Sequence, residues 1–175
     1  SVSKLRALVV EVHGLHRTNP SHNWRRTVLC LQAIFTMLVE GKDVVSALPP
    51  TYVLSLMLAG LLHDVDHPGL SNSFQHSSGS PLSVVFASAP LESYQACVAG
   101  RTLSKLGTVT HLGKDSAKEI QRVVSELIVS TDMSSHAELQ TAIGGLSTSW
   151  NPPLKKDQAI LLCRAVLHAA DFSND

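Results

Sequence analysis

Residues 49–64 read PPTYVLSLMLAGLLHD, a segment that is apolar on nearly every side of a helix. A helix of this kind has to be buried all round, so other helices must surround it. The run from Tyr52 to Leu62 is too short to cross a bilayer, which takes about 20 apolar residues. The segment then continues into HDVDHPG, which places four polar side chains at the end of a buried helix: His63, Asp64, Asp66 and His67.

Helical periodicity continues through the rest of the chain. Residues 19–41 predict a helix with Asn19 as its N-cap, Pro20 at its first position and Gly41 as its terminator. No strand-like alternation, internal repeat or interdomain linker is visible, so we predict a compact, multi-helix, all-α fold with a single domain over residues 1–175. Further helices are predicted within residues 80–90, 90–106, 114–133 and 155–171.

The spacing of apolar residues also predicts which helix faces turn toward the core. The helix within residues 114–133 has a clear inner face, formed by Ile120, Val123, Val124, Leu127 and Ile128. For residues 155–171 the predicted inner face is Leu161, Leu162 and Ala165. Two segments rich in serine, glycine and proline are predicted to be loops: residues 75–81 and 144–153.

Composition narrows the classes of partner and compartment. The formal net charge is zero and no long run of lysine or arginine occurs, so neither a nucleic-acid polymer nor an anionic membrane surface is an expected partner. Cys30, Cys97 and Cys163 are far apart and odd in number, and we interpret them as reduced thiols in the core. We therefore expect a cytoplasmic domain, which leaves open a membrane attachment elsewhere in a longer protein.

The polar cluster at the end of the buried helix has the composition of a metal site. Pro68 and Gly69 end the helix, so neighbouring side chains can converge there. Imidazole with carboxylate suits zinc, and a carboxylate with open water positions suits magnesium or manganese. Asp64 could bridge two ions about 3.5–4 Å apart, an arrangement that clamps a phosphate. A capping aspartate beside a hydrogen-bonded histidine is the metal-free alternative for a single His-Asp pair.

The wider pattern resembles a known family. HDVDHPGLSNSF is similar to the signature of class I cyclic nucleotide phosphodiesterases, His-Asp-x-x-His-x-Gly-x-x-Asn-x-aromatic, at every fixed position. NPSHNWRR, LESYQAC, STDMSSH and LHAADFSN resemble further blocks of the family in the same order, from about residue 19 to residue 174. The resemblance implies the helical HD-type fold of that family and the hydrolysis of cyclic AMP or cyclic GMP to the 5′-nucleotide.

The resemblance also implies two divalent metal ions. His63, Asp64 and Asp171 would bind the tighter ion, expected to be zinc. Asp64 would also touch a second ion, expected to be magnesium or manganese.

The remaining roles that the resemblance implies concern protons and positioning. His22 would protonate the departing 3′ oxygen, which is otherwise a poor leaving group. His67 and Glu92 would orient the attacking hydroxide and the metal-bound waters. Asn72 and Thr131 would support this arrangement.

One residue departs from the family pattern at a ligand position. The family reads His-Asn-x-x-His, and this chain has Arg26 in place of the last histidine. Arginine stays protonated and has no lone pair for a metal. On the predicted helix His22 and Arg26 share a face, so Arg26 would point into the cleft and weaken the tight metal site. It could instead pair with Asp64 or Asp171 and stand in for the ion.

Two readings besides an active phosphodiesterase therefore stay open. One is a non-catalytic phosphodiesterase-like module with a degenerate metal site. The other is an HD-family phosphohydrolase that acts on another phosphoester. The family's purine-binding residues lie in helices beyond residue 175, so the chain is expected to be a partial domain and its preference for cyclic AMP or cyclic GMP is open. Regulatory domains or a dimer partner in a longer protein are also open.

Overall fold

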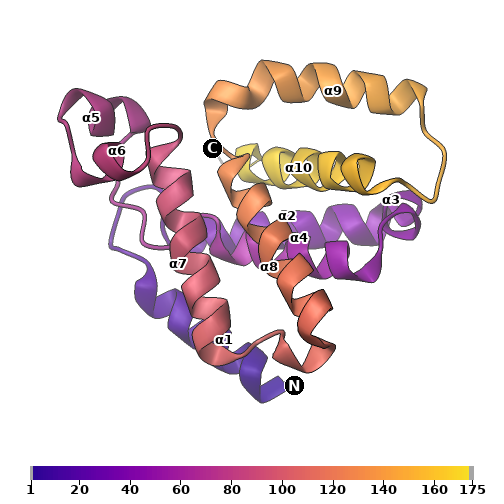
Figure 1. Ribbon diagram of the computed structural model, residues 1–175, viewed down its shortest axis with the longest axis horizontal. Helices are drawn as coiled ribbons and strands as arrows, with labels where there is room; N and C mark the ends of the chain where they lie inside the picture. The colour runs from indigo at the N-terminus through magenta and orange to yellow at the C-terminus, as the bar shows by residue number, and fades with distance from the viewer. Residues whose placement is uncertain (1, 174–175) are drawn as a thin grey trace.

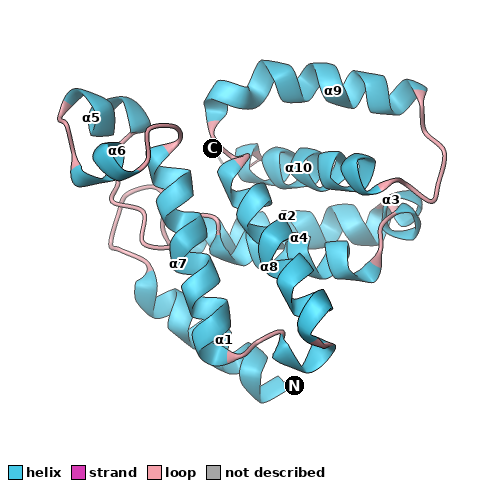
Figure 2. Cartoon of the chain, viewed as in Figure 1, coloured by secondary structure: helices cyan, strands magenta, loops and turns pink. Residues whose placement is uncertain are grey.

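The computed structural model describes residues 2–173, which consist of helices joined by loops without any strand (Figure 2). The all-α prediction is confirmed. The α-helices are α1 (Val2–Leu15), α2 (Trp24–Glu40), α3 (Lys42–Ala47), α4 (Pro50–Leu62), α5 (Asn72–Ser77), α6 (Pro81–Val85), α7 (Pro90–Leu106), α8 (Lys114–Val129), α9 (His136–Thr148) and α10 (Lys156–Phe172). Two short 3₁₀ turns, η1 (Thr110–Leu112) and η2 (Met133–Ser135), flank α8.

Helix α4 is the buried centre of the fold, as its apolar sequence predicts. It packs against α2, α8 and α10, and Figure 1 shows α8 crossing in front of α2 and α4. A side chain at Gly60 would clash with Ile34 of α2, so the glycine permits the close approach of these two helices. In the described part of the chain, no helix is long and apolar enough to span a membrane.

The predicted inner face of α8 is correct, whereas that of α10 is not. All five predicted residues of α8 are buried. On α10, Leu161, Leu162 and Ala165 are only half-buried, and the fully buried side includes Cys163 and Leu167. Helix α9 runs along α10 (Figure 1), so α10 lies between neighbours on more than one side and has no single apolar stripe.

Helix α2 begins four residues later than the sequence predicts. Its N-cap is Asn23, whose side chain accepts a hydrogen bond from the backbone N–H of Arg26. The side chain of Asn19, the predicted cap, instead donates to the carbonyl of His67 at 2.7 Å. A contact between distant segments has therefore replaced the local cap, and residues 20–23 precede the helix.

The two segments that were predicted to be loops are partly helical in the structure. Helix α9 continues through Gly144 and Gly145 because it buries Leu139 and Leu146 against its neighbours, which offsets the low helix propensity of glycine. Helix α5 takes up the first part of residues 75–81.

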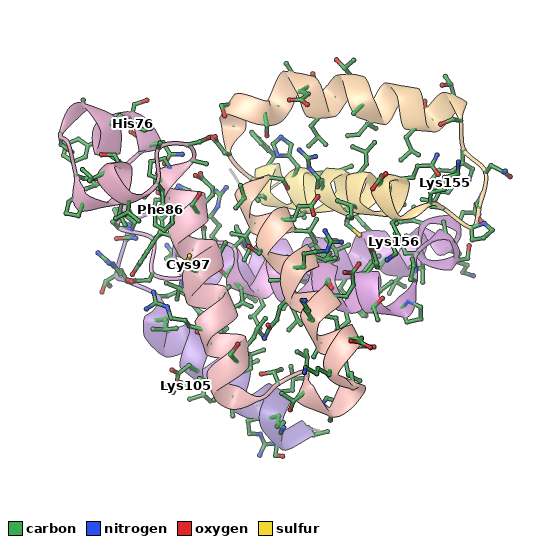
Figure 3. All side chains as sticks on the ribbon, viewed as in Figure 1. His76, Phe86, Cys97, Lys105, Lys155 and Lys156 are labelled. Carbon is green, nitrogen blue, oxygen red and sulfur yellow. The ribbon has the colours of Figure 1, made fainter. Side chains whose placement is uncertain are left out.

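One of the three cysteines was predicted wrongly to lie in the core. Cys30 and Cys163 are buried as predicted, but Cys97 is exposed on α7, where it lines an apolar pocket with Phe86 (Figure 3).

Candidate active site

The residues that the sequence singles out line one cleft of about 910 Å³. They come from six parts of the chain: the start of α2, the turn after α4, the start of α5, the start of α7, the end of α8 and the end of α10. The cleft is lined by all nine predicted site residues, which are His22, Arg26, His63, Asp64, His67, Asn72, Glu92, Thr131 and Asp171. The fold therefore gathers these residues from distant parts of the chain into one place.

Hydrogen bonds to residues outside the cleft hold the turn that follows α4 in place. Asp66 adopts a left-handed backbone with φ of 56°, which is uncommon for a residue with a side chain. Its carboxylate accepts a hydrogen bond from Arg17 Nε at 2.6 Å and another from the Tyr94 hydroxyl at 2.5 Å. Asp66 therefore does not line the cleft but ties α7 and the segment after α1 to this turn, a role that sequence reasoning missed.

His63 is buried at the end of α4 and points one ring nitrogen at two carboxylates. Nδ1 donates to the carbonyl of Gly60 at 3.0 Å, so Nε2 is the nitrogen that faces Asp171 Oδ1 at 3.3 Å and Asp64 Oδ2 at 3.6 Å. Burial by itself lowers the pKa of His63, but the charge of Asp64 and the hydrogen bond with Asp171 more than offset it and raise the pKa to about 9. Nε2 is therefore the only ring nitrogen of His63 available to a metal ion, which would have to displace the proton that this pKa implies.

Asp64 stays ionised although it is buried. Burial raises the pKa of its carboxyl, but the neighbouring charge of His63 and the hydrogen bond from His22 lower it well below its usual value. His22 Nδ1 lies 3.1 Å from Asp64 Oδ1 and donates to it. His22 itself has a left-handed backbone with φ of 50°, a conformation that strained functional residues often adopt.

His67 is a neutral hydrogen-bond donor in this arrangement. Its Nδ1 accepts a hydrogen bond from the backbone N–H of Gly69 at 3.0 Å, so the ring proton sits on Nε2. Burial, followed by the charge of His22, lowers the pKa of His67 to about 4. The ring stacks on that of His22 with centroids 4.0 Å apart. A neutral ring with its proton on Nε2 can donate to a phosphate oxygen or a water.

Arg26 lies against the carboxylates that the tight metal ion would need. Its Nη2 donates to Asp171 Oδ1 at 2.9 Å and to the carbonyl oxygen of Asp171 at 3.2 Å, and its Nε lies 3.6 Å from Asp64 Oδ2. The side chain faces the cleft as predicted, but for another reason, since His22 precedes α2 and does not share a helical face with Arg26.

Two donor sets can be compared with the needs of a metal ion. Among the described residues, only His22, Asp64 and His67 form a group of three whose ligand atoms all lie within 4.8 Å of one another, a spacing that could hold an ion. Within the described residues, the ligand atoms of the set expected to hold the tight ion do not meet this spacing. That set is His63, Asp64 and Asp171. With the guanidinium bonded to Asp171, these residues do not fit a tight dication.

Glu92, Asn72 and Thr131 also line the cleft. Asn72 Nδ2 donates to Glu92 Oε2 at 2.8 Å, while Asn72 Oδ1 accepts from the backbone N–H of Leu91 at 3.1 Å. Burial raises the pKa of Glu92. The Thr131 hydroxyl donates to the carbonyl of Ile128, so it closes the end of α8 and offers no proton to the cleft. Asn72 is thus the residue that orients Glu92.

His168 lies on α10 like Asp171 but does not line the cleft. Its Nε2 lies 2.7 Å from His136 Nδ1, and the two rings pack with Phe172. This pair joins α10 to the start of α9.

Residues 21–175 match the family model described as 3′5′-cyclic nucleotide phosphodiesterase. The chain belongs to this family. The resemblance that the sequence motifs carry is therefore confirmed, and the HD-type helical fold is confirmed by a solved relative. That relative, the phosphodiesterase domain of a RhoPDE fusion protein from the choanoflagellate Salpingoeca rosetta, superposes with a TM-score of 0.91 at 28% identity.

Two curated relatives of this phosphodiesterase family carry names that include a substrate. The high affinity cGMP-specific 3′,5′-cyclic phosphodiesterase 9A of Homo sapiens is 29% identical over 174 residues, which cover 98% of this chain and 29% of the relative. The cGMP-specific 3′,5′-cGMP phosphodiesterase 3 of Dictyostelium discoideum is 30% identical over 94% of this chain and 36% of its own length. The match to the Salpingoeca rosetta structure includes 99% of this chain but only 56% of that chain.

Proposed function

We propose that the protein containing this chain hydrolyses a 3′,5′-cyclic nucleotide in this cleft and releases the 5′-nucleotide. Membership of the phosphodiesterase family and the gathering of His22, Asp64 and His67 at the cleft support the proposal. Cyclic GMP is the first substrate to test, because the relatives from Homo sapiens and Dictyostelium discoideum are named as cGMP-specific.

The observation that carries the proposal is the hydrogen bond between His22 and Asp64. Because Nδ1 of His22 donates to the carboxylate at 3.1 Å, a protonated ring keeps its second proton on Nε2. His22 is therefore suited to give its Nε2 proton to the 3′ oxygen as the bond to phosphorus breaks.

His67 and Glu92 would act on the phosphate and on the attacking water. The Nε2–H of His67 would donate to a phosphate oxygen, which stabilises the charge that develops there. Glu92, held by Asn72 and raised in pKa by burial, would accept a hydrogen bond from the attacking water. The stacked rings of His22 and His67 would hold acid and donor at a fixed separation.

This chain supplies suitable ligands for one of the two metal ions expected from the family but not for the other. A magnesium or manganese ion keeps several waters and needs only one or two carboxylates. We propose such an ion beside Asp64, where it would supply positive charge to the phosphate. The tight zinc site lacks a fourth protein ligand and its carboxylates contact Arg26, so no step is assigned to that ion.

One observation favours a second candidate, a module that binds the cyclic nucleotide without hydrolysing it. Arg26 occupies the ligand position that an active member of the family fills with histidine, and it pairs with Asp171. A phosphate could still bind at this end of the cleft, because His22, Arg26 and His67 all present N–H groups there.

The test separates the two candidates by measuring binding and product together. The full-length protein is incubated with cyclic GMP or cyclic AMP and magnesium, 5′-nucleotide is quantified by chromatography, and binding is followed by calorimetry. We expect product from the parent, a loss of at least about 100-fold in His22→Ala, and no loss in His111→Ala, an exposed histidine outside the cleft. Binding without product would favour the second candidate, and the absence of both would refute each.

A further inference from the structure

The contact of Arg26 with the buried carboxylate of Asp64 and the partly buried carboxylate of Asp171 has a consequence beyond the hydrolysis proposed above. We propose that the Arg26 guanidinium is a built-in cation of the cleft, which takes the place of a tight divalent ion between Asp64 and Asp171. The chain would then hold these carboxylates in position without zinc. The inference rests on the proposed function only in that both concern the same cleft, and it needs no turnover to be tested.

Local structure directs Arg26 to this position. Asn23 caps α2 and its side chain accepts from the backbone N–H of Arg26 at 3.2 Å, which sets the arginine in the first helical turn. Helix α2 packs against α10, which brings Asp171 across from it, 145 positions further along the chain. Asp64 follows the end of α4, the third helix of this packing unit. Three helix ends therefore meet at the guanidinium.

The contacts of Arg26 are those of a bridging cation. Only 12% of its side chain is exposed, and it reaches both the carboxylate and the backbone carbonyl of Asp171 while Nε faces Asp64. Buried carboxylates need a compensating charge, since an isolated one is very costly to remove from water. A planar guanidinium with several fixed donors can satisfy two carboxylates at once, as a metal ion would.

The position of Arg26 opposes a dication at the same point. The two carboxylates already face the positive charge of Arg26, so an added dication would meet repulsion from it. The other protein donors are His63 Nε2 and the same two carboxylates. Three protein ligands are enough for a catalytic zinc site, but here two of the three are shared with the guanidinium, and no fourth protein ligand takes their place.

Neighbouring residues do not supply the missing ligand. Burial raises the pKa of the Cys30 thiol to about 12, so it is protonated at neutral pH. The rings of His13 and His16 lie against Trp24, with centroids 5.1 and 5.7 Å from it, and His16 Nε2 is 3.3 Å from the Thr27 hydroxyl. His16 Nδ1 is buried without a hydrogen-bond partner, but among the described residues neither upstream histidine belongs to a group of three ligand atoms close enough to share an ion.

The test measures metal content and stability in the full-length protein. Zinc is counted by mass spectrometry after dialysis against buffer with added zinc, and the unfolding temperature is recorded with and without EDTA. We expect the parent to retain little zinc and to unfold at the same temperature in EDTA. Arg26→His restores the fourth ligand, so we expect one zinc per chain, an affinity gain of at least about 10–100-fold, and an unfolding temperature that EDTA lowers.

Two further variants control for charge and for an added histidine. Arg25→His makes the same change at the exposed neighbouring position, so it should behave as the parent. Arg26→Gln removes the charge without adding an imidazole, and we expect it to unfold at a lower temperature without gaining zinc. If Arg26→His does not fold, the zinc content and EDTA response of the parent still decide.

Stoichiometric zinc in the parent, with unfolding at a lower temperature once EDTA removes it, would overturn the inference. So would an Arg26→Gln variant that is as stable as the parent. A parent that neither binds nor hydrolyses cyclic nucleotide but behaves as expected toward zinc would refute the proposed function and support the inference. A parent that hydrolyses the nucleotide while retaining zinc at this site would do the reverse.

Discussion

The guanidinium of Arg26 lies 2.9 Å from the carboxylate of Asp171, although the two residues are 145 positions apart in the chain. This contact joins the start of α2 to the end of α10 beside the buried imidazole of His63. It is therefore both an element of the tertiary structure and part of the cleft, and the two roles can be separated by measuring stability apart from chemistry.

Replacing Asp171 by alanine should strongly destabilise the fold. The change leaves the guanidinium of Arg26 and the imidazole of His63 without a carboxylate that both contact. Breaking a buried ion pair by removing one partner costs about 3–5 kcal/mol of unfolding free energy. Urea denaturation measures the loss. Glu126→Ala removes one partner of the exposed Arg122–Glu126 pair and should cost less than about 1 kcal/mol, so equal losses in the two variants would contradict a buried pair.

Local signals in the sequence account for the helices that were predicted well. The bounds of α7 agree with the predicted residues 90–106, because Pro90 stands at its first turn and Gly107 ends it with a positive φ of 56°. The start of α2 was predicted wrongly because Asn19 and Pro20 form a plausible local cap. The side chain of Asn19 is bonded to the carbonyl of His67, a contact 48 positions away that no local pattern contains.

In the candidate site, too, some features were predicted correctly from the sequence and others were missed. Motif resemblance found nine of the residues that line the cleft, since each of the nine lies within a short block of fixed spacing. The Arg17–Asp66–Tyr94 contacts were missed because they join residues that belong to no common motif, 49 and 28 positions apart. Arg26 was correctly expected to face the cleft, but the reason given, a helical face shared with His22, fails because His22 precedes the helix.

The three cysteines should differ sharply in their reaction with a thiol reagent. Burial raises the pKa of Cys30 and of Cys163 to about 12, so neither forms the reactive thiolate near pH 8, whereas Cys97 is exposed. Within this chain we expect one thiol to react rapidly with Ellman's reagent under native conditions and all three after unfolding. Cys97→Ser should abolish the fast phase, and a fast phase that persists in this variant would contradict the burial of the other two.

The pair His136–His168 should make stability depend on pH below neutrality. Burial, and then the charge of His136, lower the pKa of His168 below its usual 6.5, while Asp171 opposes and Arg164 adds to the shift. Below about pH 6.5 the unfolded chain therefore binds this proton more readily than the folded protein, so the stabilisation that is complete above that pH declines as the pH falls.

Urea denaturation at pH 7 and pH 5 measures this dependence. His168→Gln keeps a side chain that can hydrogen-bond to His136 but does not titrate, so it should lose less unfolding free energy than the parent between the two pH values. His111→Gln removes an exposed histidine and should behave as the parent. An identical loss in the parent and in His168→Gln would show that other groups account for the acid sensitivity.

Replacing Asp64 by alanine should abolish both hydrolysis and its dependence on magnesium. This carboxylate orients His22 through a hydrogen bond of 3.1 Å and is the proposed ligand of the magnesium ion. Its loss leaves the imidazole of His22 without the carboxylate that orients it, so we expect turnover to fall by at least about 100-fold. Product formation over a range of magnesium concentrations measures both effects. Asp115→Ala, at an exposed position in the first turn of α8, should keep the parent's rate and magnesium response.

Asp64→Asn distinguishes the two parts of this role. The amide keeps the size of the side chain and can still accept a hydrogen bond from His22, but it lacks the negative charge that attracts a metal cation. We expect it to fold like the parent and to hydrolyse as poorly as Asp64→Ala. If Asp64→Asn retains the turnover and magnesium response of the parent, the negative charge is not required. Asp64 would then act only by positioning His22, and the magnesium ion would have to bind elsewhere.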